Sequence, residues 1–356
     1  MSVPRVRALV RGAIASMAIG MAVATASSLG FLGCSAAPRT PKAEALPPLE
    51  TASLARIAQG PGARWEVIVR PKSVFDGALA APLSRLAPAD GFDRLSKRLG
   101  FDVRAVPEAI FVGYAGGTFS AAQLPAGASP ADALDAFDRR TLDPSGRESV
   151  RPDVVRAWGR MPDGESAVAA GMWSTKGDVI VGEAGTRSDG ETGPVRVSIA
   201  LALGKLRPER SLAEQSPFGA LQAWIADAPL SAIARCPLDA MLDEERRPAD
   251  EAKPVVTQEC DGAAIALRPA PSGALSIELR VAGRWGGDAE AAGKEVRAIV
   301  AHVIDSDLGR ALGLRDGKLE VSLSATAIDA RLVVDAAKLA EGARQLVEAD
   351  VRDVLR

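Results

Sequence analysis

The sequence predicts an α+β fold in which antiparallel β-sheets carry helices packed on one face. Three observations support this class. Many short segments alternate apolar and polar residues, turns rich in Gly and Pro join them, and several longer segments have the 3.6-residue apolar period of a helix. Because tight turns connect successive strands, we expect antiparallel pairing.

The first half of the folded region, residues 55–212, alternates strands and short helices. Its clearest helix, at 129–139, begins at Ser129, which can cap the first turn, followed by Pro130, a residue suited to the first helical position. The segment 194–203 fits either a helix or a strand. The other expected elements are strands at 65–70, 109–114, 118–124, 154–160, 166–173 and 178–183, and helices at 73–80 and 91–99.

The second half, residues 213–356, follows a similar order. The last helix carries Leu339, Leu346, Val347 and Val354 on one stripe, so we expect it to form a lid on the second sheet. The expected elements are strands at 230–236, 263–268, 274–283, 318–323 and 327–334, and helices at 238–245, 287–305 and 335–355.

Both halves can be written as β-α-ββ-α-βββ-α units, which predicts an internal duplication. Chance recurrence of a common order is the alternative, since no residue-level identity links the halves.

The strands of the second half have one apolar face only, as in sheets with helices on one side and water on the other. This pattern does not favour a half-barrel carrier of lipid, which needs an apolar concave surface. The segments 109–114 and 166–173 are apolar on both faces. They fit either central strands covered on both sides or the lining of a hydrophobic pocket.

The N-terminus has the three parts of a secretory signal. Arg5, Arg7 and Arg11 precede an acid-free apolar run over residues 13–32, and Gly33 directly precedes Cys34. This segment resembles the signal peptide and lipobox of bacterial lipoproteins.

The resemblance implies that residues 1–33 are removed and that Cys34 becomes a lipidated N-terminus. Residues 34–54 are rich in Pro and Ala and would form a tether spanning roughly 50 Å at most. In lipoprotein sorting an Asp after the lipidated cysteine favours the inner membrane, so Ser35 favours the outer membrane. An uncleaved transmembrane anchor and a plain cleaved signal remain as alternatives.

Cysteine usage agrees with an oxidising compartment. If Cys34 carries lipid, Cys236 and Cys260 remain as a pair, and we predict a disulfide between them. The alternative is two separate buried thiols. No C-x-x-C motif is present, which argues against a redox or metal role for the pair.

The charge balance argues against a nucleic-acid partner. The chain has 43 basic and 45 acidic residues, and removing the three signal-peptide arginines makes the mature form more acidic. A local basic run is interpreted as the solvated side of a short helix, or alternatively as a surface for an acidic partner; it comprises Arg94, Lys97, Arg98 and Arg104.

Catalytic motifs are lacking in the sequence. His302 is the single histidine, so a zinc site built on several histidines cannot form. No Ser of the mature chain lies in Gly-x-Ser-x-Gly or begins Ser-x-x-Lys, and no nucleotide-binding glycine pattern follows a strand. We therefore expect no enzyme activity, no metal and no cofactor. The sequence predicts a lipid-anchored envelope protein that binds an unidentified envelope protein or has a structural role, with a carrier of an apolar ligand as the alternative.

Overall fold

The structure of the chain is a computed structural model. The structure describes residues 54, 63–86, 90–114, 117–142, 146–151, 154–163, 166–175, 179–186, 218–236, 256 and 259–354.

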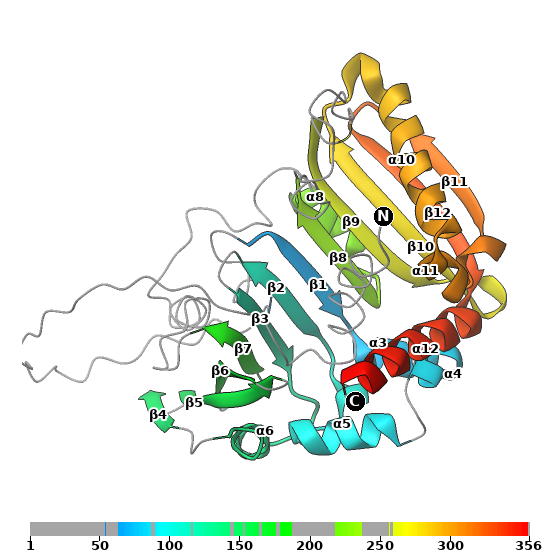
Figure 1. Cartoon of the computed structure of the whole chain (residues 1–356). Coiled ribbons are helices and arrows are strands. Elements are labelled where there is room, and N and C mark those ends of the chain that lie inside the picture. The colour runs from blue at the N-terminus through cyan, green and yellow to red at the C-terminus, as the bar shows by residue number, and fades with distance from the viewer. Residues whose placement is uncertain are drawn as a thin grey trace, which may run out of the picture.

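The described strands form one antiparallel twelve-stranded sheet, in the order β11-β12-β10-β9-β8-β1-β2-β3-β7-β6-β5-β4 (Figure 1). The predicted α+β class with antiparallel strands is confirmed. The strands are β1 (Trp65–Val69), β2 (Ala109–Tyr114), β3 (Gly117–Gln123), β4 (Gly146–Arg151), β5 (Val154–Asp163), β6 (Ser166–Thr175), β7 (Val179–Thr186), β8 (Leu230–Arg235), β9 (Cys260–Pro269), β10 (Ala274–Gly283), β11 (Lys318–Leu323) and β12 (Ala327–Asp335).

The two halves of the chain meet at the pairing of β1 with β8 near the middle of this sheet. Outward from this pair, the first half continues with β2, β3 and β7, and the second half continues with β9, β10 and β12. In each half, three strands that are consecutive in the chain are thus followed by the last strand of that half. The halves therefore share a strand order, although four strands complete the first half and two complete the second. Duplication itself stays a prediction, and the predicted boundary between residues 212 and 213 lies outside the described residues.

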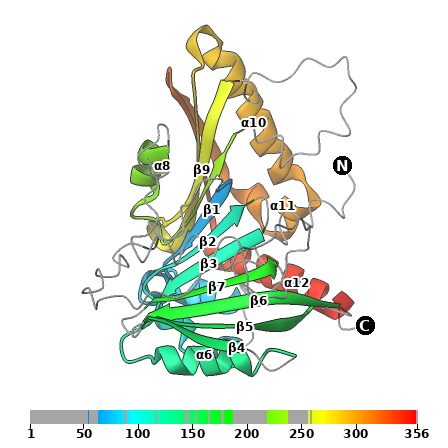
Figure 2. The same ribbon diagram turned by 90° about the vertical axis from the view of Figure 1, so that its left-hand side faces the viewer.

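The described α-helices lie on both sides of the sheet, most of them on one side (Figure 2). None of them is long and apolar enough to span a membrane. They are α3 (Pro71–Phe75), α4 (Ala80–Leu83), α5 (Gly91–Leu99), α6 (Pro130–Asp138), α8 (Phe218–Ile225), α10 (Ala289–Asp305), α11 (Asp307–Ala311) and α12 (Ala336–Val354).

The strand register assigns side chains to two faces of the sheet. Ile68 of β1 lies opposite Ile110 of β2 and Ser231 of β8. The register of the successive strand pairs places the side chains of Arg156 on β5 and Arg280 on β10 on the same face of the sheet as Ile68. We call this the open face. The other face is covered by α6 and α10, which pack on Ala157 and Met172, and on Val281, Ile328 and Ala330, respectively.

One described helix, α8, departs from the expected arrangement because it packs on the open face. Its Phe218, Leu221 and Ile225 share a buried core with Ile110 and Val112 of β2. The segment 109–114 is therefore a central strand, and α8 covers its side chains on the open face. For the segment 166–173, a central strand covered on both sides and the lining of a hydrophobic pocket both remain as predictions.

Helix α12 forms where the sequence predicts it, but it does not lie across the sheet. It packs on α4, on the turn Ser84–Leu86 and on α11, and only its start approaches β12. Small residues allow close contacts along it: Ala336, Ala340 and Ala343 are buried, and a Cβ on Gly342 would lie 1.9 Å from the Ala311 carbonyl oxygen. The prediction of a lid on the second sheet holds only for the start of the helix, where Ala336 and Leu339 pack with Leu275, Leu332 and Val334 of the sheet. The rest of the helix extends over α4, Ser84–Leu86 and α11 instead. The side chain of Leu346 lies outside the described residues.

Asp335 caps α12, and this contact gives a pH-dependent contribution to stability. Its Oδ1 accepts hydrogen bonds from the backbone nitrogens of Ala337 and Lys338, at 2.8 and 3.0 Å, which lower the pKa of this carboxyl from 3.8. A carboxyl whose pKa is lowered by folding stabilises the native state above its unfolded pKa, and this contribution is lost as the pH falls through the folded pKa.

We therefore expect Asp335→Asn, which keeps a capping side chain without the charge, to be less stable than the wild type at pH 7. The difference in the free energy of unfolding should shrink as the pH is lowered through 3.8 and below. Urea unfolding of both proteins from pH 7 to pH 3 measures it, and a difference independent of pH would contradict this role of the charge.

Candidate functional site

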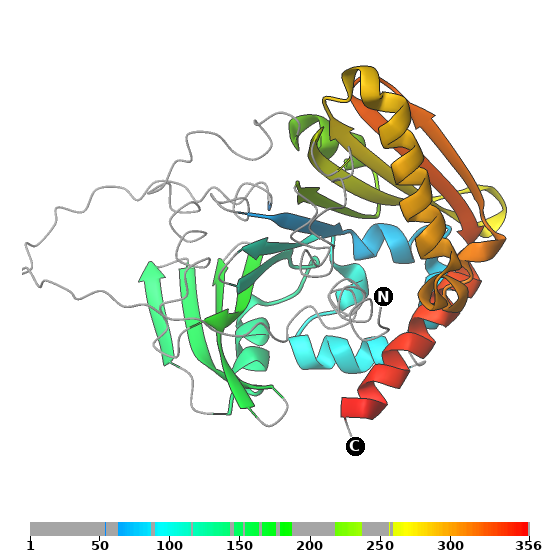
Figure 3. The same cartoon turned by 45° about the horizontal axis from the view of Figure 1, so that its top comes forward.

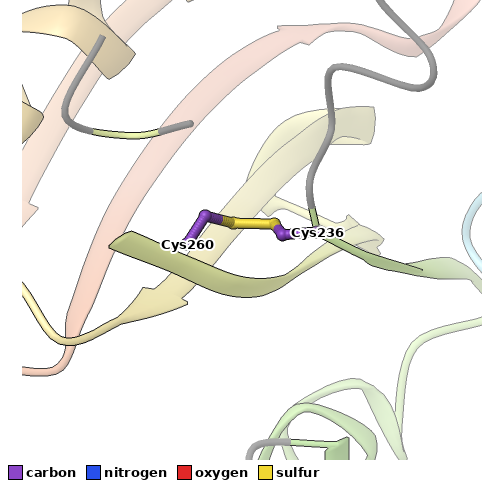
Figure 4. Close-up of a disulfide and its surroundings, with 2 residues drawn as sticks. All are labelled: Cys236 and Cys260. Atoms are coloured by element: carbon purple, nitrogen blue, oxygen red, sulfur yellow. A yellow bond between two sulfur atoms is a disulfide. The ribbon is translucent and has the colours of Figure 1, made fainter. Parts of the chain in front are cut away.

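The two predicted disulfide cysteines meet at neighbouring strand ends (Figure 4). Cys236 follows β8 and Cys260 begins β9, and the structure bonds them with a Cα–Cα distance of 5.7 Å. This separation is the usual one for a disulfide. The prediction of a disulfide is confirmed, and the bond links the neighbouring strands β8 and β9 near the middle of the sheet. Cys34, the predicted lipidation site, lies outside the described residues.

A stack of one tryptophan between two arginines lies on the open face of the second half. Trp224 projects from α8, and the guanidinium carbons of Arg268 on β9 and Arg280 on β10 lie 5.1 and 4.9 Å from its ring centre. A cation over an indole ring is attracted by the negative charge of the ring face. The two arginines therefore hold Trp224 over the sheet.

Ion pairs extend this stack across the outer strands. Arg268 contacts Glu278, Arg280 contacts Asp329 at 2.7 Å, and the Arg331 Nε donates to the Ser276 hydroxyl at 3.0 Å. Arg280 and Asp329 form two parallel hydrogen bonds, and this contact with Asp329 raises the pKa of the Arg280 guanidinium. We call this set the tryptophan–arginine surface: Trp224, Asp227, Arg268, Ser276, Glu278, Arg280, Asp329 and Arg331.

Burial of this surface decreases toward the free edge of the sheet. The side chain of Arg268 is 18% exposed beneath α8, whereas that of Arg331 on β12 is 51% exposed. Beyond it, Glu320 of the edge strand β11 is 56% exposed on the same face. The inner part is thus a fixed platform, and the outer part is available to a partner.

Two arginines also hold the C-terminal end of α8. Arg268 donates through Nη2 to the Trp224 carbonyl oxygen and contacts Asp227, while Arg70 donates from Nη1 to the Ala228 carbonyl oxygen at 2.6 Å. Cations at a helix C-terminus satisfy carbonyl groups that the helix leaves unpaired. Arg70 follows β1, so this contact fixes α8 to both halves of the chain.

No catalytic constellation appears among the described residues. His302 is exposed in the last turn of α10, and the described part of the chain brings together no group of three His, Cys, Asp or Glu side chains that could hold a metal ion. The absence of enzyme activity stays a prediction.

The basic run of the first half divides into two parts. Arg94 pairs with Asp90, and Arg104 pairs with Asp93 and Asp102. Lys97 and Arg98, by contrast, are exposed, and no carboxylate of the described residues lies within ion-pair distance of either.

Sequence reasoning predicted the polar side of the second-half strands but missed Trp224 above it. The stack joins positions 224, 268 and 280, which share no sequence spacing, and α8 itself has no polar face to mark it as an amphipathic helix. Comparison with known proteins adds no functional assignment, since no protein-family model, no curated protein and no solved structure matches the chain.

Proposed function

We propose that this chain is a lipid-anchored protein of the bacterial cell envelope that binds another envelope protein through the tryptophan–arginine surface. The observation that carries the binding role is the arrangement of Trp224 between Arg268 and Arg280 on the open face. Trp and Arg are the residue types most enriched at the energetic centres of protein interfaces. The anchor is supported by the resemblance of residues 1–34 to a lipoprotein signal peptide.

The polarity of this surface favours a protein partner over the alternative, an apolar ligand. Glu278, Arg280, Asp329 and Arg331 cover the region where a lipid chain would need apolar side chains, and each is held in an ion pair. A partner with its own charged side chains can exchange or extend these pairs at the rim of an interface.

The binding role can be tested by photo-crosslinking in the producing cell. A photoreactive residue in place of Glu320, beside the tryptophan–arginine surface, should crosslink to an envelope protein. The same residue in place of Lys294, on α10 across the sheet, should not. Arg331→Ala should reduce the crosslink at least fivefold, since truncating an arginine at the energetic centre of an interface costs more than about 1 kcal/mol.

Arg297→Ala is the matched control, because Arg297 is an exposed arginine on α10. Equal crosslinking from both positions, or an equal loss with Arg331→Ala and Arg297→Ala, would contradict the assigned surface. A lipid co-purifying with the protein in place of a crosslinked partner would favour the carrier alternative.

The anchor is tested separately in the same cells. Globomycin, which blocks lipoprotein signal cleavage, should cause an unprocessed precursor to accumulate. A mature protein of unchanged mass after Cys34→Ala would refute lipidation while leaving the crosslinking result intact.

A further inference from the structure

One arginine on the open face of the first half has charged donors without acceptors. Arg156 lies on β5, and its guanidinium carbon is 5.4 Å from the centre of the Trp158 ring on the same strand. Its Nε and Nη2 are buried, and among the described residues no oxygen accepts a hydrogen bond from either nitrogen. Packing on the ring explains why the side chain lies there, but it does not explain two unpaired N–H groups, which cost free energy when buried.

Arg156 is far from the tryptophan–arginine surface. In Figure 3, β4 and β5 (green) lie at the opposite edge of the sheet from β11 (orange). Eight strand spacings separate β5 from β10, which amounts to roughly 40 Å along the sheet. The unpaired donors of Arg156 therefore belong to a separate place on the open face.

Arg280 shows what the same two nitrogens bind elsewhere in this protein. Its Nε and Nη2 donate to the two carboxylate oxygens of Asp329, at 2.7 and 2.9 Å, and Asp329 lies directly opposite on the neighbouring strand. The Arg280 guanidinium also lies against a tryptophan ring, at 4.9 Å from its centre. The two arginines thus share a ring contact, and they differ in that the fork of Nε and Nη2 holds a carboxylate only in Arg280.

The carboxylate that faces Arg156 across the sheet does not occupy this fork. Glu148 of β4 lies directly opposite Arg156, as Asp329 lies opposite Arg280. The Glu148 side chain is exposed, however, and it accepts from neither nitrogen. Arg156 as a whole is only half-buried. A carboxylate from outside the chain can therefore reach the fork once the guanidinium turns at the end of its side chain.

We propose that Arg156, held against Trp158, binds the carboxylate of an acidic side chain on an envelope protein. This inference rests on the proposed function for its partner. Two parallel N–H donors match the two oxygens of a carboxylate, so such a pair fixes direction as well as position. Arginine and tryptophan are also enriched at the energetic centres of protein interfaces. The open face would then hold a second contact, at the far end from the tryptophan–arginine surface.

Nuclear magnetic resonance on the full-length protein tests the fork, with acetate as the probe because it carries the carboxylate of an acidic side chain. Acetate should shift the Nε–H signal of Arg156, which is identified by its loss in Arg156→Lys, and sodium chloride at the same ionic strength should not. The Nε–H signal of Arg280, already bonded to Asp329, is the matched control and should stay in place. No shift with acetate, equal shifts with both salts, or equal shifts of both arginines would overturn the proposal.

The same spectra show whether Glu148 is the partner of Arg156 in solution. Glu148→Gln should leave the Arg156 signal in place, because that carboxylate is not bonded to the fork. Asp329→Asn should move the Arg280 signal, because this substitution changes an existing pair. Changes of similar size in the two variants would overturn the proposal, since the fork would already be occupied.

The partner is tested by photo-crosslinking in the producing cell. A photoreactive residue in place of Glu148 should crosslink to an envelope protein, and Arg156→Lys, which keeps the charge but not the fork, should reduce the crosslink about tenfold. Arg284→Lys changes an exposed arginine after β10 and is the matched control, which should keep the crosslink.

Equal losses in Arg156→Lys and Arg284→Lys would overturn the proposal, as would a small organic acid bound to the protein in place of a crosslinked partner. A missing crosslink from Glu320 alone would instead contradict the proposed function. The acetate titration and the crosslink from Glu148 would still support the site at Arg156.

Discussion

Trp285→Ala is expected to lower the free energy of unfolding by about 3–5 kcal/mol, because it removes the largest fully buried side chain among the described residues. Trp285 is 1% exposed and lies between β10 and α10. It packs with Val281, Val296 and Ile328 in the core under α10. Its ring also covers Gly283, where a Cβ would lie 2.5 Å from the ring atom Cζ2.

Trp285→Phe provides a matched control for the size of this effect. The indole Nε1 is buried and has no hydrogen-bond acceptor among the described residues. The substitution by phenylalanine therefore removes packing contacts but no hydrogen bond. We expect it to cost under about 2 kcal/mol. Urea unfolding of the three proteins measures both values, and equal costs for the two variants would show that the indole N–H, rather than ring volume, stabilises this core.

Cys236→Ser/Cys260→Ser should destabilise the protein by about 2–4 kcal/mol, the usual value for a native disulfide. The bond closes a loop with a sequence separation of 24, so its removal increases the conformational freedom of the unfolded chain. Unfolding in urea under oxidising conditions measures the loss.

The wild type treated with a thiol reductant should unfold at the same urea concentration as the double variant. Reductant should have no effect on the variant itself. An unchanged midpoint for the reduced wild type would contradict a stabilising role of the disulfide.

The sequence predicted the strands best where one face of the sheet is buried and the other is polar. In β10 and β12 the alternation of apolar and charged residues is regular, and both strands form close to the predicted bounds. The edge strand β4 was missed because Gly146–Arg151 has no apolar face. It is held instead by pairing with β5 and by the contact of Arg147 with α6.

The candidate surface was less predictable, because its parts come together only in the folded chain. The polar side of β10 was evident from Glu278 and Arg280. The tryptophan above it belongs to a short apolar helix that carries Gly219 in its first turn, a poor signal for a helix. The disulfide could be predicted because counting three cysteines, one of them at the lipobox, left a single pair.

The pairing of β1 with β8 has a consequence for the rate of folding. Trp65 faces Ala234 across this ladder, so the two halves of the sheet join only through segments about 170 positions apart in the chain. Contacts between such distant segments are slow to form, because a long loop must close before any of them contributes. The proposed lipoprotein would be exported unfolded. Its sheet cannot be completed while residues after 230 are still crossing the membrane, so the chain stays unfolded during export.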